Sequence, residues 1–288
     1  HSGAAVRLAI LPAPADHGIV FVRTDLDRAR IPARWDHVTP SQLCTLLDNG
    51  RGATVSTVEH VMAALSGTGI NNAVVEVNGP EVPILDGSAA PFVQGILEAG
   101  LRQQAAPLRA IRILRPVEVR AGDAIARLDP SDMLEIDFHI DFADAAIGRQ
   151  RKTLNMSNGA FVRELCNSRT FCRQQDVDAM RAGGLALGGT LENAVVVEGD
   201  RILSPGGLRH ADEPVRHKML DALGDLALAG MPILGRYTGV RAGHALTNRL
   251  LHALFADPGA FVTVDCGHVT NCKLPGVGVS RADVPARR

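Results

Sequence analysis

The clearest periodic pattern of hydrophobic positions in the chain covers residues 215–230. Apolar side chains recur there every three or four residues, which is the spacing of an amphipathic helix. Gly230, followed by Pro232, provides a stop signal at the end of the pattern. The apolar positions are Met219, Leu220, Leu223, Leu226 and Ala227. The pattern therefore predicts one helix around which the other elements can be organised.

The first hundred residues predict strands together with two helices. Two apolar runs, 4–11 and 18–23, flank a turn-rich segment and predict a hairpin. The polar, proline-bearing residues 24–42 predict an excursion from the sheet. Further along, the pattern predicts helices over residues 58–67 and 88–100 and a strand over residues 72–77.

A polar, proline-containing break at residues 102–108 precedes a second series of strands, so we place a domain boundary between residues 1–102 and 109–288. Strict alternation over residues 134–142 places His139 on the wetter face of its strand rather than in a binding site. The pattern also predicts strands over 111–119, 124–128, 194–198, 237–246 and 261–266, and helices over 160–167 and 248–254. Both halves have strands followed by two helices, which suggests a duplicated unit.

Composition narrows the class of protein. The 288 residues are 46% hydrophobic and 21% charged, which suits a globular protein with a proper core. A net charge of −1 offers no basic field for nucleic acid or lipid, and an aromatic content of 3% disfavours base stacking. Five cysteines without a disulfide-type spacing indicate a reducing compartment, and no apolar run approaches the ~20 residues of a membrane span. We expect a cytoplasmic monomer that has no transmembrane segment and binds no nucleic acid.

Three ionisable residues share one stripe of the helix predicted over 215–230. At about 100° per residue, His217, Asp221 and Asp225 are about 40° apart and border its apolar face. Ionisable groups beside a core need a partner charge or a cation. His217 and Asp221 can bind one metal ion from a single helix face, but they do not complete a zinc site. By itself the stripe is more typical of surface salt bridges.

Glu59 and His60 begin another predicted helix. His60 would complete three protein ligands and leave a fourth position for water, which is the arrangement of catalytic zinc, and Glu59 can take a proton from that water. Two imidazoles and one carboxylate suit iron(II) as well as zinc. On their own, a glutamate favoured by the helix dipole and a half-exposed histidine are an ordinary helix start.

His244 follows Gly243 ahead of a predicted helix, and taken alone it is a turn histidine. Kept charged by Asp225, it can stabilise a developing oxyanion and protonate a leaving amine. In the tail, Cys266, His268 and Cys272 have a spacing that is weak evidence for a metal, so we expect no second zinc site there.

Five strings of residues carry a specific resemblance, and together they cover nearly the whole chain except its tail. They are 56–60 (STVEH), 80–92 (PEVPILDGSAAPF), 168–171 (SRTF), 215–225 (VRHKMLDALGD) and 243–246 (GHAL). In these strings and their order the chain resembles the UDP-3-O-acyl-N-acetylglucosamine deacetylases, the zinc amidases of the committed step of lipid A synthesis.

The resemblance implies roles for particular residues. The implied zinc ligands are His60, His217 and Asp221; the implied general base is Glu59; and the implied second acid/base group is His244, with Asp225 as its partner. The implied substrate contacts are Thr170 at the oxyanion, Phe171 beneath the glucosamine, Lys218 as a cation facing the substrate and Arg241 near the diphosphate. Without the family, Thr170 and Phe171 would be interpreted as a capping hydroxyl and a core ring, and both cations as solvated charges.

The fold that the resemblance implies is α+β, with two topologically similar two-layer α/β sandwich domains and the active site between them. An inserted βαβ segment, at about residues 172–203, would form an acyl-chain tunnel. Its implied wall consists of Leu185, Leu187, Gly189 and Val195 or their neighbours. The interior of such a tunnel is expected to be mostly apolar.

Two departures from the family pattern affect this expectation. Family members have additional residues before the His-Ser-Gly that stands here at positions 1–3, so the first strand of the N-terminal domain is expected to be missing. After Phe171 the family commonly has glycine and an apolar or aromatic residue, whereas this chain has Cys172 and Arg173, which changes the expected tunnel mouth.

These features predict a zinc-dependent hydrolase that removes the N-acetyl group from UDP-3-O-(3-hydroxyacyl)-N-acetylglucosamine. Two alternatives remain open from the sequence. One is a zinc amidase that acts on another acylated or nucleotide sugar, and the other is a non-catalytic relative that binds a nucleotide sugar.

Overall fold

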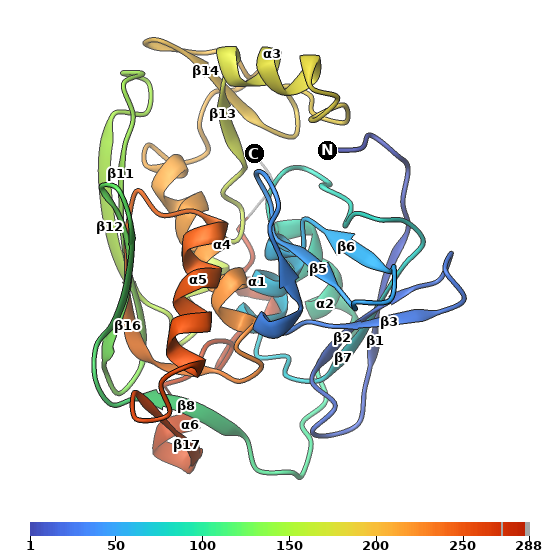
Figure 1. The fold of residues 1–288 in the computed structure, drawn as a ribbon, viewed down its shortest axis with the longest axis vertical. Helices are drawn as coiled ribbons and strands as arrows, with labels where there is room; N and C mark the ends of the chain where they lie inside the picture. Colours follow the sequence, from blue (N-terminus) through green and yellow to red (C-terminus); the bar gives the residue numbers. More distant parts are fainter. Residues whose placement is uncertain (272, 286–288) are drawn as a thin grey trace.

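The computed structural model describes residues 1–271 and 273–285, and it has an α+β fold in which helices lie between two sheets (Figure 1). The main helices are α1 (Glu59–Gly67), α2 (Ala90–Ala99), α3 (Gln174–Ala182), α4 (Glu213–Ala227) and α5 (His244–Phe255), and a short α6 (His268–Asn271) follows. The helices predicted over residues 58–67, 88–100 and 215–230 are confirmed. Within the described part of the chain, none of the helices combines the length and hydropathy needed to cross a membrane.

The N-terminal sheet has the order β1-β7-β2-β3. Its strands are β1 (Leu8–Pro12), β2 (Ile19–Arg23), β3 (Ala29–Pro32) and β7 (Ala73–Val77). The predicted hairpin is wrong, because β7 lies between β1 and β2 and pairs antiparallel with the first and parallel with the second. β2 is buried on both faces and pairs with a strand on each edge. Its second partner is β3, which lies in residues 24–42, so the expectation that this whole segment leaves the sheet is wrong.

The C-terminal sheet is larger, with the order β12-β11-β16-β10-β9. In addition, β8 pairs with the start of β16, and β17 pairs with β8. Its strands are β8 (Arg109–Ile113), β9 (Val117–Ala121), β10 (Ala124–Pro130), β11 (Leu134–Asp141), β12 (Arg149–Asn155), β16 (Ile233–Val240) and β17 (Phe261–Asp265). The strand predicted over 111–119 is two strands, since Pro116 lies between them. β12 went unpredicted because its sequence is almost entirely polar.

The prediction that one face of residues 134–142 is exposed to solvent is only partly correct. The apolar residues of β11 are buried as the alternation predicts, and His139 is half-buried on the opposite face. Asp137 on that same face is nevertheless buried, because Arg151 and Arg236 cover its carboxylate and donate hydrogen bonds to it. Ion pairing therefore replaces solvent at this position.

The two halves share one topology. In each half a late strand inserts between two earlier strands that follow each other along the chain, antiparallel to one and parallel to the other: β7 between β1 and β2, and β16 between β10 and β11. A helix precedes each inserted strand and another follows it, α1 and α2 in the first half and α4 and α5 in the second. The duplicated unit that the sequence suggested is therefore visible in the connectivity.

Each half carries extra structure at the same point, just before α1 or α4. The first intervening segment, residues 33–58, contains a turn of 3-10 helix (Trp35–His37) and the small sheet of β4 (Val38–Thr39), β5 (Leu46–Asp48) and β6 (Thr54–Ser56). The second intervening segment, residues 156–212, begins with a π-helix (Phe161–Leu165), where a helix over 160–167 was predicted. It continues with β13 (Phe171–Arg173), α3, β14 (Val195–Glu198) and β15 (Arg201–Ile202), with β13 and β14 parallel.

Helices α1 and α4 pack against each other at the centre of the molecule (Figure 1). Gly224 allows this contact, because a Cβ atom built there would lie 2.0 Å from the carbonyl oxygen of Glu59. A glycine at the contact lets two helix backbones approach closely. The spacing between the first turn of α1 and the middle of α4 is thereby fixed, and the ionisable residues lie at this contact.

Candidate active site

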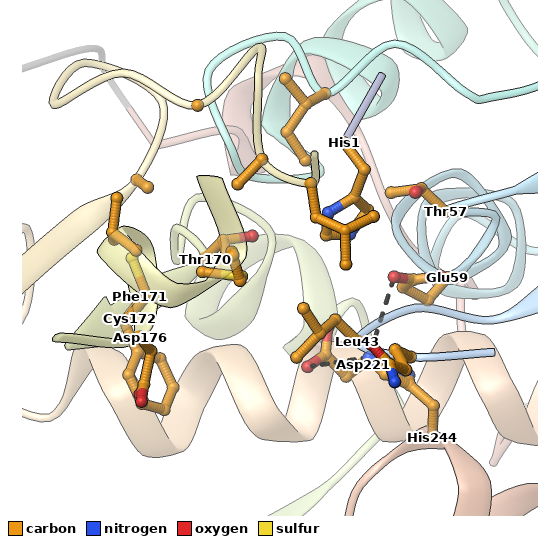
Figure 2. Close-up of a pocket in the computed structure, with 18 of the residues that line it drawn as sticks. His1, Leu43, Thr57, Glu59, Thr170, Phe171, Cys172, Asp176, Asp221 and His244 are labelled. Carbon is orange, nitrogen blue, oxygen red and sulfur yellow. Dashed lines mark ion pairs between the residues drawn. The ribbon is translucent and has the colours of Figure 1, made fainter. Parts of the chain in front are cut away.

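A cavity of about 1510 Å³ lies at the contact between the two halves. The N-terminal half contributes the start of α1, the C-terminal half contributes α4 and the start of α5, and both intervening segments complete the wall. Figure 2 shows Glu59, Asp221 and His244 grouped in one part of this cavity and Phe171, Cys172 and Asp176 in another. The first part is polar and buried, so it is the candidate site for chemistry.

The structure brings His60, His217 and Asp221 together. One possible ligand atom from each residue lies within 4.8 Å of the others. His217 and Asp221 are one helical turn apart on α4, and His60 lies in the first turn of α1. The Nε2 atoms of His60 and His217 lie 3.6 and 3.3 Å from Oδ1 of Asp221, and all three side chains are buried.

These three residues fit a metal ion. At a metal–nitrogen distance of about 2.0–2.1 Å, tetrahedral ligand atoms are about 3.4 Å apart, close to the two spacings observed. Oδ1 of Asp221 is buried and lacks a hydrogen-bond partner, which is costly unless a cation is bound there. The Nδ1 atom of His217 lies 3.1 Å from the carbonyl oxygen of Ser168. This contact orients the ring with Nε2 toward Asp221, as an outer hydrogen bond does for a metal ligand.

The pKa directions favour the forms that bind metal. Burial lowers the pKa of His217 to about 4, so its ring is neutral near pH 7. Burial opposes charge on Asp221, but the neighbouring His217 and Lys218 outweigh it and hold the pKa of this carboxyl well below its usual range. Neutral imidazole and ionised carboxylate are the protonation states that a metal requires.

Glu59 is buried beside this cluster. Its Oε2 accepts a hydrogen bond of 3.0 Å from the backbone N–H of Thr45, and its Oε1 lies 3.8 Å from Nε2 of His244. Burial raises the pKa of Glu59, since desolvation disfavours the carboxylate more than the nearby histidines favour it. A carboxyl group with a raised pKa is suited to accept a proton and release it again.

His244 is the first residue of α5, so the strand predicted over 237–246 is wrong at its end: β16 stops at Val240. Gly243, in an extended conformation, is the residue before the helix. Nδ1 of His244 lies 2.9 Å from Oδ2 of Asp225. Burial opposes the charged ring, but the carboxylates of Asp225 and Glu59 outweigh it and raise the pKa of His244 to about 10. The ring is therefore protonated near pH 7.

Thr170 and Phe171 enter the cavity from the second intervening segment. The Thr170 hydroxyl donates to the carbonyl oxygen of Gly87, at 3.3 Å, across the boundary between the halves. Phe171 lies edge-on to Phe142 and to His217, with ring centroids 5.4 and 6.2 Å apart. Phe171 thus lines the wall next to a possible metal ligand.

Two cations line the cavity in different settings. Lys218 donates to Oδ2 of Asp221 at 2.8 Å and is largely buried, whereas Arg241 is exposed and pairs with Asp141 at 2.6 Å. Burial opposes charge on Lys218, but the nearby carboxylates, Asp221 first, raise its pKa, so it keeps its proton. Lys218 is tied to the polar cluster, and Arg241 lies at the open side of the cavity.

Only some of the residues expected to form the cavity wall in the second intervening segment line the cavity. Leu185 and Gly189 line the cavity. Leu187 is 58% exposed and its backbone N–H donates to the carbonyl oxygen of His1, whereas its neighbours Ala186 and Gly188 line the cavity. Val195 is fully buried behind the wall, in β14, and its neighbours Ala194 and Val196 line the cavity instead.

The sequence analysis missed two residues that form hydrogen bonds to the side chains of the site. Thr45, in the first intervening segment, donates to both Glu59 and Asp225, and Ser168 accepts from the ring of His217. No spacing pattern marks Thr45. Ser168 stood in a recognised string, but the contact uses its backbone carbonyl, which every residue has. Of the three tail residues considered for a metal, Cys272 lies outside the described residues.

A buried cluster of two imidazoles and a carboxylate, next to a glutamate and a protonated histidine in a large cavity, is typical of metal-assisted hydrolases. Comparison with known proteins specifies the family. The profile of the UDP-3-O-acyl N-acetylglycosamine deacetylases (LpxC) matches residues 1–256. The chain belongs to this family.

Individual relatives agree with that assignment. A protein of Anaeromyxobacter sp. (strain Fw109-5) is 51% identical over 288 residues, which are 100% of this chain and 90% of the relative. A protein of Phenylobacterium zucineum (strain HLK1) is 54% identical over 91% of this chain and 90% of its own length. A protein of Shewanella sp. (strain W3-18-1) is 49% identical over 92% of this chain and 87% of its own length. All three are named UDP-3-O-acyl-N-acetylglucosamine deacetylase.

Proposed function

We propose that this protein hydrolyses the N-acetyl group of UDP-3-O-(3-hydroxyacyl)-N-acetylglucosamine. The observation that carries the proposal is the meeting of Glu59 and His244 beside the His60, His217 and Asp221 cluster, with Nε2 of His244 3.8 Å from Glu59 and 3.9 Å from Asp221. The names of the relatives support the substrate. The class of reaction is therefore amide hydrolysis, with acetate released.

His60, His217 and Asp221 would hold a zinc ion, and iron(II) suits the same three ligands. When bound, such an ion polarises the amide carbonyl and makes a water molecule more acidic. Glu59 takes the proton from the attacking water, since its Oε1 lies 3.8 Å from Nε2 of His244 and its raised pKa suits a base. The ionised form of Glu59 needed for this step is favoured by the charged His244 ring beside it.

His244 carries the opposite charge to the one that develops during the reaction. Its protonated ring stabilises the oxyanion of the tetrahedral intermediate, and a proton then reaches the leaving amine. Asp225 keeps the ring oriented through its contact with Nδ1. Thr170, which also lines the cavity, assists at the oxyanion.

The remaining lining residues bind the substrate. Phe171 lies under the glucosamine ring, Lys218 faces the substrate, and Arg241 at the open side approaches the diphosphate. Leu185 and Gly189 belong to an inserted segment of about residues 172–203 that accommodates the acyl chain. We divide the chain into domains 1–102 and 109–288, and we place the protein in the cytoplasm because the four cysteines in the described residues are free.

Replacement of Glu59 by glutamine tests the base. Glu59→Gln keeps the shape and removes the proton acceptor, so we expect turnover to fall by about 10²–10⁴-fold with bound metal unchanged. Release of acetate from the acylated substrate and metal analysis of anaerobically purified protein measure the two quantities. Full activity in Glu59→Gln would contradict the assignment.

A comparison of substrates separates the alternatives. We expect the wild-type protein to hydrolyse acylated UDP-N-acetylglucosamine much faster than the form without the acyl chain. Equal turnover of both would indicate an amidase that acts on other nucleotide sugars. Metal binding without release of acetate would indicate a binding protein.

A further inference from the structure

Thr45 contacts the proposed base, Glu59, and the partner of the proposed acid, Asp225, although it lies outside every recognised string. It is 1% exposed and stands at the end of a loop of the first intervening segment, just before β5. Its backbone N–H donates to Oε2 of Glu59 at 3.0 Å, and its hydroxyl donates to Oδ1 of Asp225 at 2.6 Å. One residue from the N-terminal half therefore reaches carboxylates from both halves.

In each of the two carboxylates, Thr45 donates a hydrogen bond to the oxygen that is not the one nearest His244. The other oxygen of Glu59, Oε1, lies 3.8 Å from Nε2 of His244. The other oxygen of Asp225, Oδ2, lies 2.9 Å from Nδ1 of His244. A carboxylate that is hydrogen-bonded at one oxygen loses rotational freedom about its terminal bond, so the free oxygen keeps a defined direction.

Thr45 is itself held in place. Its carbonyl oxygen accepts a hydrogen bond from the backbone N–H of Val58, the residue before α1, at 3.5 Å. The next residue, Leu46, pairs with Ser56 in the small sheet of the same segment. Thr45 is held by the residue that precedes α1, and Leu46 is held by the strand that leads into α1. These contacts fix the position of the two donor groups of Thr45 relative to Glu59.

We propose that Thr45 is a positioning residue that sets the relative orientation of the base, Glu59, and the acid, His244, the latter through Asp225. Thr45 does not line the cavity, so we expect it to make no contact with substrate. The inference rests on the proposed function, because the acid and base roles of these residues belong to it. Thr45 acts on the rate of the chemical step and not on substrate binding.

The test compares variants that differ in one hydroxyl. Thr45→Val removes the hydroxyl and keeps the shape and the backbone N–H, whereas Thr45→Ser keeps the hydroxyl. We expect kcat to fall by about 10–100-fold in Thr45→Val, as for other outer hydrogen-bond partners of active sites, with KM unchanged. Thr45→Ser should retain most of the wild-type kcat. If the valine impairs folding, Thr45→Ala provides the same comparison without a branched side chain.

Thr68→Val is the matched control. Thr68 is also 1% exposed, and its hydroxyl donates to the carbonyl oxygen of Ala64 at 2.7 Å, at the far end of α1. This variant loses a buried hydroxyl of the same kind away from the site, so its kcat should match the wild type. An equal fall of kcat in Thr45→Val and Thr68→Val would assign Thr45 a merely structural role and overturn the proposal.

A second measurement does not depend on turnover. The Nδ1 proton of His244, held by Asp225, should give a downfield proton resonance in protein with labelled histidine. We expect this signal in the wild type and in Thr45→Ser, and faster exchange of the proton in Thr45→Val. If the wild type releases no acetate, the proposed function fails while this measurement still decides the role of Thr45. An unchanged resonance in Thr45→Val would overturn the proposal.

Discussion

The two intervening segments occupy the same place in the duplicated topology, yet they contribute differently to the site. The first, residues 33–58, brings one buried polar residue, Thr45, against Glu59 and Asp225. The second, residues 156–212, forms much of the cavity wall, and its helix α3 buries only Val177. One segment therefore fixes the reacting groups, and the other shapes the space in front of them.

This difference shows how a duplicated scaffold separates two requirements. Reacting groups need positions defined within a fraction of an ångström, which buried hydrogen bonds and packed helices provide. A binding wall needs shape, and exposed connecting segments tolerate change more easily than packed elements. We expect substitutions in the second segment to alter substrate preference, except where the segment is attached to α4.

The largest effect on stability is expected at that attachment. Arg169 and Glu213 form a buried pair, and the guanidinium donates to both oxygens of the carboxylate at 2.9 and 3.1 Å. Arg169→Met leaves Glu213 buried without its cation, which should cost about 3–5 kcal/mol in the free energy of unfolding, as urea denaturation can measure. The exposed pair of Arg201 and Glu198 is the control, and Arg201→Met should cost at most about 1 kcal/mol. Equal costs would mean that the second segment is not anchored through Arg169.

An intermediate effect is expected at the contact of α1 with α4. Gly224→Ala places a Cβ 2.0 Å from the carbonyl oxygen of Glu59, so the helices must separate. We expect a loss of about 1–3 kcal/mol in the free energy of unfolding and a fall in kcat, because the base moves away from the ligands on α4. Gly95→Ala, on α2 with nothing within 4 Å, should stabilise the protein by about 0.5–1 kcal/mol and leave kcat unchanged. Wild-type kcat in Gly224→Ala would show that the spacing of the helices does not control the chemistry.

The smallest effect is expected in the wall itself. Leu185 lines the cavity, whereas Leu187 is exposed outside it. Leu185→Ala should raise KM for an acylated substrate by up to about 10-fold and leave KM for a non-acylated one unchanged, since only an acyl chain needs the apolar contact. Leu187→Ala should change neither value, and stability should change by less than about 0.5 kcal/mol in both variants. A larger change of KM in Leu187→Ala would place the acyl chain along a different path.

Much of the scaffold could be predicted from sequence, because its signals are local. The helices α1 and α4 follow apolar spacings within one segment, and the side chains of His217 and Asp221 lie on one face because four positions make about one turn. The order of the strands in the sheets was harder to predict from the sequence. The strand β7 is 50 residues from β2 along the chain and still lies beside it, since Ala73 pairs with Ile19 in parallel, and no local pattern indicates such a partner.

By itself, the sequence determined that α1, α2 and α4 form, that one face of α4 carries ionisable groups, and the family to which the strings of residues point. Only the tertiary structure decided that β7 and β16 insert into their sheets, that Leu187 faces outward, and that Thr45 holds Asp225 from 180 positions away. The physical reason is the range of the interactions: periodicity and helix starts depend on neighbouring residues. The hydrogen bonds that orient a buried carboxylate depend on where distant segments meet.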